Sequence, residues 1–110
     1  MNTKSNFRER LNKAIALRED GRAKQDMAIL KEARDLLLNM SKDHPDNAEI
    51  NYQIGIAYDN SGLNNKAIPY YVKSIDQGLS GSDLQRCLFG LKACSAPLSI
   101  RIFACGGFST

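Results

Sequence analysis

Histidine and cysteine, two of the residues that most often bind transition metals, are scarce in this sequence. The chain of 110 residues has one histidine, His44, and three cysteines, Cys87, Cys94 and Cys105. No two cysteines form a closely spaced CxxC pair, and His44 lies far from all of them in the sequence. Structural zinc sites are built from such pairs. We therefore expect neither a metal site nor a cofactor.

The motifs of common enzyme classes are missing too. The chain has no GxSxG, HExxH, GxxxxGK or GxGxxG pattern, so a nucleophile elbow, a zinc protease and the usual phosphate-binding loops are not indicated. Residues 59–62 (DNSG) resemble the start of a calcium loop. Their glycine comes too early and no glutamate follows at the twelfth position, which predicts a plain turn. Cys87 and Cys94 share one helical face, where cysteine usually packs as a small hydrophobe. We do not expect an enzyme.

Long apolar runs are absent as well. The opening residues, MNTKSNFRER, contain no apolar stretch of the kind that signal peptides carry. No later segment approaches the length that a membrane-spanning helix needs. Hydrophobic content of 43% and charged content of 25% are typical of one globular domain. The sequence therefore predicts a cytoplasmic domain without membrane contact.

The basic residues concentrate near the start of the chain. Residues 1–24 hold seven basic side chains against three acids, whereas residues 41–84 hold three against six. A basic end can bind nucleic acid or an anionic surface. Here the acids are interleaved with the bases and no arginine-rich run occurs. We interpret the basic end as a solvated helix face and do not expect nucleic acid as a partner. The seven basic residues are Lys4, Arg8, Arg10, Lys13, Arg18, Arg22 and Lys24.

Helical periodicity dominates the first half of the chain. Apolar residues at spacings of three and four predict two helices, at about 4–19 and 27–42. The sequence Glu19-Asp20-Gly21 suits the end of the first helix, and the polar residues 22–26 form either a loop or an extension of a helix. The apolar positions are Phe7, Leu11, Ala14 and Ile15 in the first helix, and Leu30, Ala33, Leu37 and Met40, with Leu36 beside them, in the second.

Three more helices are predicted in the second half. Pro45 breaks the second helix, and Asp46 is placed to cap the third, with Glu49 as its reciprocal partner in a capping box. The third helix ends near Gly62, the fourth covers about 64–77, and Ser80 or Ser82 caps a fifth. Their apolar stripes are Ile50, Ile54, Ala57 and Tyr58; Ala67, Ile68, Tyr71 and Ile75; and Leu84, Cys87, Leu88 and Leu91. The fold class is therefore all-α, with about five helices.

Part of this pattern repeats after 34 residues, the spacing that separates Ala33 from Ala67 and Leu37 from Tyr71. Residues 48–81 resemble one tetratricopeptide repeat. Ile54-Gly55 occupies its Leu-Gly position, Tyr58 the following aromatic, Ala67 the small residue of the second helix and Tyr71 the large ring after it. Three positions depart from the repeat pattern, namely Asn51, Ser74 and Leu79.

The resemblance, to a bacterial subfamily of tetratricopeptide proteins, implies antiparallel helix hairpins stacked as a short right-handed superhelix. Residues 1–94 would form this domain. Within it, 4–42 is an irregular first hairpin, 48–81 the best-matching repeat and 82–94 the first helix of an incomplete third repeat. The remaining residues, 95–110, are apolar and broken by glycine. We expect this tail to be a truncated or frame-shifted end; the alternative is that it folds back over the fifth helix.

The resemblance also implies a function, because the first helices of stacked hairpins line a concave groove. We expect a scaffold that binds a partner protein or peptide there. In the alternative reading, Tyr52 and Ile56 pack against a neighbouring hairpin or a second copy of the chain. A second hypothesis is self-association through the uncovered last helix, at Leu84, Leu88 and Leu91. The positions that the repeat pattern assigns to the groove are Glu49, Tyr52, Gln53, Ile56, Asp59 and Asn60.

Overall fold

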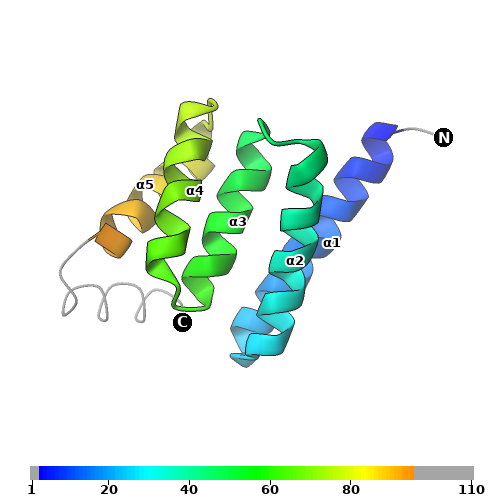
Figure 1. Cartoon of the computed structure of the whole chain (residues 1–110), viewed down its shortest axis with the longest axis horizontal. Helices are drawn as coiled ribbons and strands as arrows, with labels where there is room; N and C mark the ends of the chain where they lie inside the picture. Colours follow the sequence, from blue (N-terminus) through cyan, green and yellow to red (C-terminus); the bar gives the residue numbers. More distant parts are fainter. Residues whose placement is uncertain (1–2, 96–110) are drawn as a thin grey trace.

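The computed structural model describes residues 3–95 of the chain, and over this range the protein is entirely helical. The expectation of an all-α fold with about five helices is confirmed, and no strand occurs among these residues. The predicted tail, 95–110, lies outside them apart from Ser95, the last residue of the fifth helix. The helices are α1 (Thr3–Lys24), α2 (Met27–Asp43), α3 (Ala48–Asn60), α4 (Asn64–Asp76) and α5 (Gly81–Ser95) (Figure 1).

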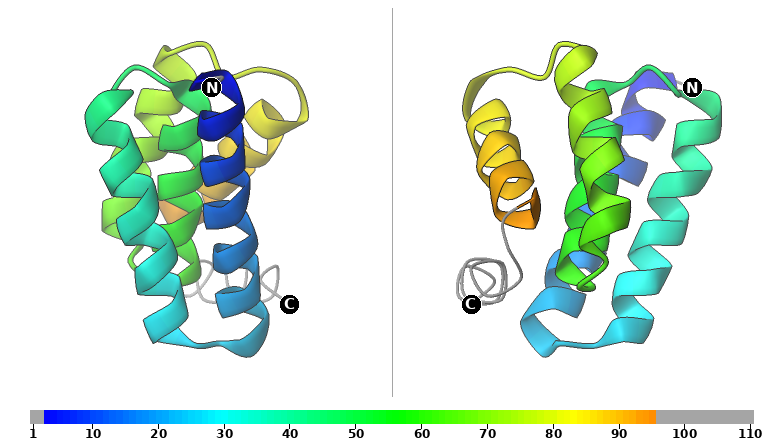
Figure 2. Two further views of the ribbon diagram at one scale, coloured as in Figure 1. Left: turned by 90° about the vertical axis from the view of Figure 1, so that its right-hand side faces the viewer. Right: turned by 60° about the vertical axis from the view of Figure 1, so that its left-hand side comes forward.

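The five helices form two antiparallel hairpins and a single last helix. Contacts are most extensive within the pairs α3/α4 and α1/α2, and then between α4 and α5 and between α2 and α3. In the left view of Figure 2, α2 and α4 lie on one side, α1 and α5 on the other, and α3 between them. Since α3 also contacts α1 and α5, it is the helix that joins the two ends of the molecule.

The first hairpin is longer than the sequence predicts. Helix α1 does not end near Gly21 but continues to Lys24, and only Gln25 and Asp26 connect it to α2. A β-carbon at Gly21 would lie 3.0 Å from the Leu30 backbone nitrogen, so glycine here allows α2 to approach closely. Gln25 adopts a left-handed conformation (φ 53°), which ends the helix. The Asp26 carboxylate then caps α2 by accepting hydrogen bonds from two backbone amides.

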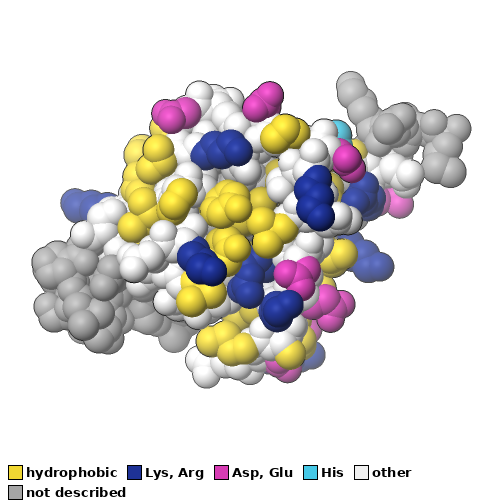
Figure 3. Space-filling view, viewed as in Figure 1, with side chains coloured by type: hydrophobic (Ala, Val, Ile, Leu, Met, Phe, Trp, Pro, Cys, Tyr) yellow, Lys and Arg dark blue, Asp and Glu magenta, His cyan; other side chains and the backbone are white. Residues whose placement is uncertain are grey.

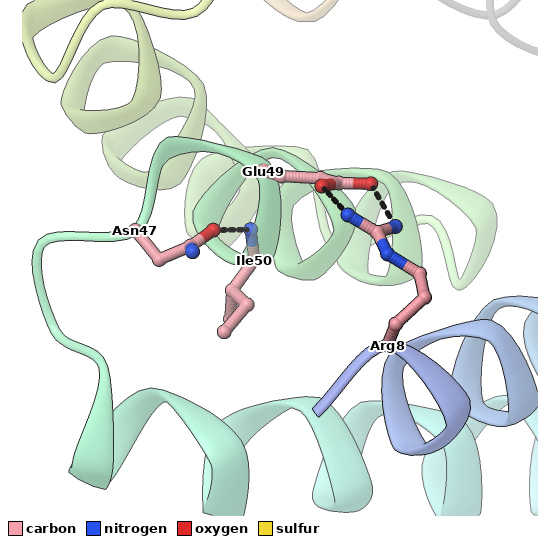
Figure 4. A network of polar contacts seen from close by, with 4 residues as sticks. All are labelled: Arg8, Asn47, Glu49 and Ile50. Atoms are coloured by element: carbon pink, nitrogen blue, oxygen red, sulfur yellow. Dashed lines mark hydrogen bonds and ion pairs between the residues drawn. The ribbon is translucent and has the colours of Figure 1, made fainter. Parts of the chain in front are cut away.

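The cap of α3 also differs from the prediction. Asn47, not Asp46, occupies the cap position, and its Oδ1 accepts a hydrogen bond from the Ile50 amide at 2.9 Å. Glu49 is not a reciprocal capping partner, because its carboxylate accepts two hydrogen bonds from Arg8 of α1, at 2.9 and 3.0 Å (Figure 4). A tertiary contact has thus replaced the local one that the sequence pattern indicates.

Two clusters of buried side chains form the interior, and α3 contributes to both. The first lies among α1, α2 and α3, and the second among α3, α4 and α5. Sharing α3 couples the packing of the two hairpins, because a shift of this helix disturbs both clusters. The first cluster contains Leu11, Ala14, Leu37, Met40, Ile50, Ile54 and Ala57, and the second contains Tyr52, Ala67, Tyr71, Leu79, Cys87 and Cys94.

The ring of Tyr71 occupies a slot between two helical glycines. A β-carbon at Gly55 of α3 would lie 2.7 Å from the ring, and one at Gly90 of α5 would lie 3.2 Å from its outer end. The Tyr71 hydroxyl donates a hydrogen bond to Asp59 at 2.8 Å. One side chain of α4 therefore sets the approach of both neighbouring helices. The other positions that resemble the repeat signature are buried too (Ala33, Leu37, Ile54 and Ala67), except Tyr58, which is half-buried.

Two positions that depart from the repeat pattern are buried polar residues with partners. Asn51 donates hydrogen bonds to the Pro45 carbonyl at 3.1 Å and to Gln77 Oε1 at 2.6 Å. Gln77 itself donates to the same carbonyl at 3.0 Å, so the α2–α3 connection is fastened to the end of α4. Ser74 donates to the Tyr71 carbonyl at 2.8 Å, and its Oγ lies 3.5 Å from Cys87 of α5. The Asn51 amide nitrogen and the Ser74 hydroxyl, which burial would otherwise leave unpaired, thus both have hydrogen-bond acceptors.

Replacing Gly55 by alanine tests the slot. In an unconstrained helix this change would gain about 1 kcal/mol from helix propensity. Here the added methyl overlaps the Tyr71 ring, so we expect a net loss of about 1–2 kcal/mol in the free energy of unfolding. Urea unfolding followed by circular dichroism measures it. Gly90→Ala, whose β-carbon has more room, should be less harmful. A Gly55→Ala protein more stable than wild type would contradict this account.

Candidate functional site

A buried arginine of α1 contacts the middle and the end of α3. Arg18 is only 7% exposed, and its guanidinium donates to Gln53 Oε1 at 3.2 Å and to Asn60 Oδ1 at 3.0 Å. Both acceptors are neutral amides, and burial lowers the pKa of the guanidinium. The neighbouring charge of Glu19 acts in the opposite direction and raises this pKa, but Glu19 is not one of the two hydrogen-bond acceptors.

Tyr52 of α3 lies next to this network. It is 4% exposed, its ring centroid lies 6.4 Å from that of Tyr71, and burial raises the pKa of its hydroxyl to about 12. Among the neighbouring groups, Asp83 and Cys87 of α5 raise this pKa further, whereas Arg86 of α5 and Arg18 of α1 lower it. Over residues 6–95, no hydrogen bond to this hydroxyl is observed. We call the surface around Arg18, Tyr52 and Arg86 the α1–α3–α5 face.

The structure shows what the six predicted groove residues contact. Glu49 pairs with Arg8, and Asp59 accepts from the Tyr71 hydroxyl. The oxygens of Gln53 and Asn60 accept from Arg18, as described above, and Ile56 is half-buried against the second cluster. Tyr52 belongs to that cluster too, together with buried residues of α4 and α5.

Arg18 is absent from the set of groove residues that the sequence predicts. The sequence does place Arg18 on the stripe that faces the core, because it follows Leu11 and Ala14 at helical spacing. A basic residue on an apolar stripe indicates either a buried polar network or a binding site. The partners of Arg18, 35 and 42 residues further along the chain, depend on how the hairpins pack and carry no sequence signal.

The residues proposed for self-association are unequally exposed. Leu84 and Leu91 are half-buried against the second cluster, whereas Leu88 is 48% exposed. The three leucines therefore do not form one uncovered apolar stripe, and their role in pairing stays a prediction. Cys87 and Cys94 are fully buried, which confirms their expected place in the core.

The side of the molecule formed by α2 and α4 carries an aromatic pair. Tyr58 and Tyr70 stack with their centroids 5.7 Å apart. The Arg34 guanidinium lies 4.9 Å from the Tyr58 centroid, and the Lys66 ammonium lies 6.0 Å from it. Figure 3 shows hydrophobic side chains gathered in the middle of this side, with lysine and arginine around them. Because the rings and cations already contact one another, this cluster has a structural explanation.

Neither a metal site nor a membrane span is apparent in the part of the chain that is described. No three His, Cys, Asp or Glu side chains there are grouped so that they could hold a metal ion. No helix there is long and apolar enough to cross a bilayer. Comparisons with protein-family models, with curated proteins and with solved structures find no match to this chain.

The two arginines that connect α1 to α3 should differ in their contribution to stability. Arg18→Met leaves one buried and one half-buried amide oxygen without their donor, so we expect a loss of about 1–3 kcal/mol in the free energy of unfolding. Arg8→Met breaks a solvent-exposed ion pair and should cost less than about 1 kcal/mol, and less still at high salt. Urea unfolding at low and high salt measures both. An equal loss in the free energy of unfolding for the two variants would show that the hydrogen bonds of Arg18 contribute no more to stability than an exposed ion pair.

The tyrosine at the centre of the face should make stability depend on pH at the alkaline end. Folding raises the pKa of Tyr52, so the unfolded chain releases its proton first. Its contribution is complete below about pH 10, the unfolded pKa, and is lost as pH rises toward 12. Tyr52→Phe should therefore lose less stability than wild type over this interval, as measured by unfolding at a series of pH values. Parallel curves for the two proteins would refute the shift.

Proposed function

We propose that this chain is a protein-interaction module of the tetratricopeptide type. In this proposal its hairpins stack as a short right-handed superhelix, and a partner protein or peptide binds across the α1–α3–α5 face. The observation that carries it is Tyr52, a buried tyrosine whose hydroxyl has no hydrogen-bond partner among the described residues, where three helices meet. A buried polar group of this kind favours a ligand that supplies the missing hydrogen bond.

The chemistry of the face favours a partner with acidic or carbonyl groups. Arg18 offers a guanidinium whose hydrogen bonds to Gln53 and Asn60 are both to neutral amides, and Arg86 is an exposed cation within electrostatic reach of Tyr52. The half-buried Ile56, one helical turn after Tyr52, adds apolar area. An extended peptide with a carboxylate near the Tyr52 hydroxyl would accept a hydrogen bond from that hydroxyl and would offer its charge to Arg18 and Arg86.

The module would act by binding alone, with no reaction of its own. Its most buried nucleophiles, Cys87 and Cys94, pack in the second cluster, and burial raises the pKa of the Cys87 thiol, which opposes a reactive thiolate. We also propose that it works in the cytoplasm. Two cysteines buried in an apolar core suit a reducing compartment.

Affinity capture with matched variants tests the binding face. The immobilised wild-type chain is compared with Tyr52→Phe/Arg86→Glu, which keeps the ring but removes the hydroxyl and reverses one charge. Lys73→Glu, an exposed residue of α4 on the other side, is the control for reversed charge. We expect a lysate protein that wild type and Lys73→Glu retain and the double variant loses at least tenfold, by quantitative mass spectrometry. The same retention by all three chains would place any binding elsewhere.

A further inference from the structure

The first hairpin contains an open groove between α1 and α2. Its volume is about 570 Å³. A second, more open depression on α2 shares two of its residues, Glu32 and Leu36. The groove is lined by Arg10, Lys13, Ala16, Leu17 and Asp20 from α1 and by Glu32, Leu36 and Met40 from α2.

The charges along this groove are separated into two ends. Because the helices are antiparallel and joined at residues 25–26, Asp20 lies across from Glu32 at the end nearest the connection. Leu17 and Leu36 follow in the middle, where Leu36 is 39% exposed. Lys13, and beyond it Arg10, form the far end. The groove therefore has an acidic end, an apolar middle and a basic end.

We infer that this groove is the interface between two copies of this chain related by a twofold axis. A twofold rotation that turns one groove end over end brings its basic end onto the acidic end of the other. Lys13 of each copy then faces Glu32 of the second copy, and the exposed Leu36 side chains meet in the middle. Asp20 already pairs with Lys24 at 3.2 Å, so the charge match depends chiefly on Glu32.

This pairing is independent of the proposed peptide face. The groove residues Lys13 and Leu17 lie on the side of α1 opposite to Leu11 and Arg18, which point to α3. A dimer formed in this way would present two α1–α3–α5 faces, and each could still bind its own partner. Loss of dimerisation therefore does not imply loss of partner binding, and loss of partner binding does not imply loss of dimerisation.

Charge exchange between the two ends tests the pairing. In a twofold dimer, Lys13→Glu turns two attractive pairs into two repulsive ones, and so does Glu32→Lys. We expect each variant alone to dimerise roughly ten- to hundredfold more weakly than wild type. An equimolar mixture should form heterodimers of near wild-type affinity, because both pairs across the axis then join opposite charges again. Sedimentation equilibrium over a range of concentrations measures all four samples.

An apolar variant separates this interface from the one on α5. Leu36→Glu should give a monomer, whereas Leu88→Glu, at the most exposed leucine of α5, should leave the dimer intact. Circular dichroism confirms that both are equally helical. The inference is wrong if wild type is a monomer at every concentration, if the mixed charge variants do not pair, or if Leu88→Glu alone abolishes the dimer.

Discussion

The contact on which the rest of this structure depends is the ring of Tyr71 between Gly55 and Gly90. A ring from α4 meets α3 on one side and α5 on the other, and neither helix could carry a β-carbon at that point without a shift. The hydroxyl then reaches Asp59, whose charge, with burial, raises the pKa of Tyr71. Because α3 also packs against α1, the spacing that this ring imposes extends to the α1–α3–α5 face and to Tyr52 within it.

Much of the fold could be predicted, because the apolar spacing of a helix is a local property. Many residues of the predicted stripes are buried, including Leu37, Ile54 and Cys87, although Leu88 is not. The boundaries were less predictable. In the sequence, Gly21 indicates a helix end. In the structure it lies inside α1, where the missing side chain allows α2 to approach closely. In the sequence, Glu49 indicates a capping box. In the structure its carboxylate accepts two charge-assisted hydrogen bonds from Arg8, 41 residues earlier, which are stronger than a bond to a backbone amide.

The candidate site was predictable only in outline. The repeat pattern indicates which positions of α3 face α1 and α5, and Gln53 and Asn60 do face α1. It does not indicate that their oxygens bind Arg18, because that depends on the angle and register of two separate hairpins. Tyr52 illustrates the same difficulty. A tyrosine on a predicted groove reads as an exposed contact, whereas its ring belongs to the core and only the hydroxyl remains for a ligand.

The contacts of the basic residues in α1 change the interpretation of its positive charge. Excess positive charge in a sequence usually suggests a polyanionic partner, but that argument assumes that the charges share one surface. Here Arg8 pairs with Glu49, and Arg18 is buried against two amides on the core side. Lys13, by contrast, lines the groove on the opposite side. Charges that point in different directions cannot act together on one polyanion, so we interpret α1 as a helix that serves two protein interfaces.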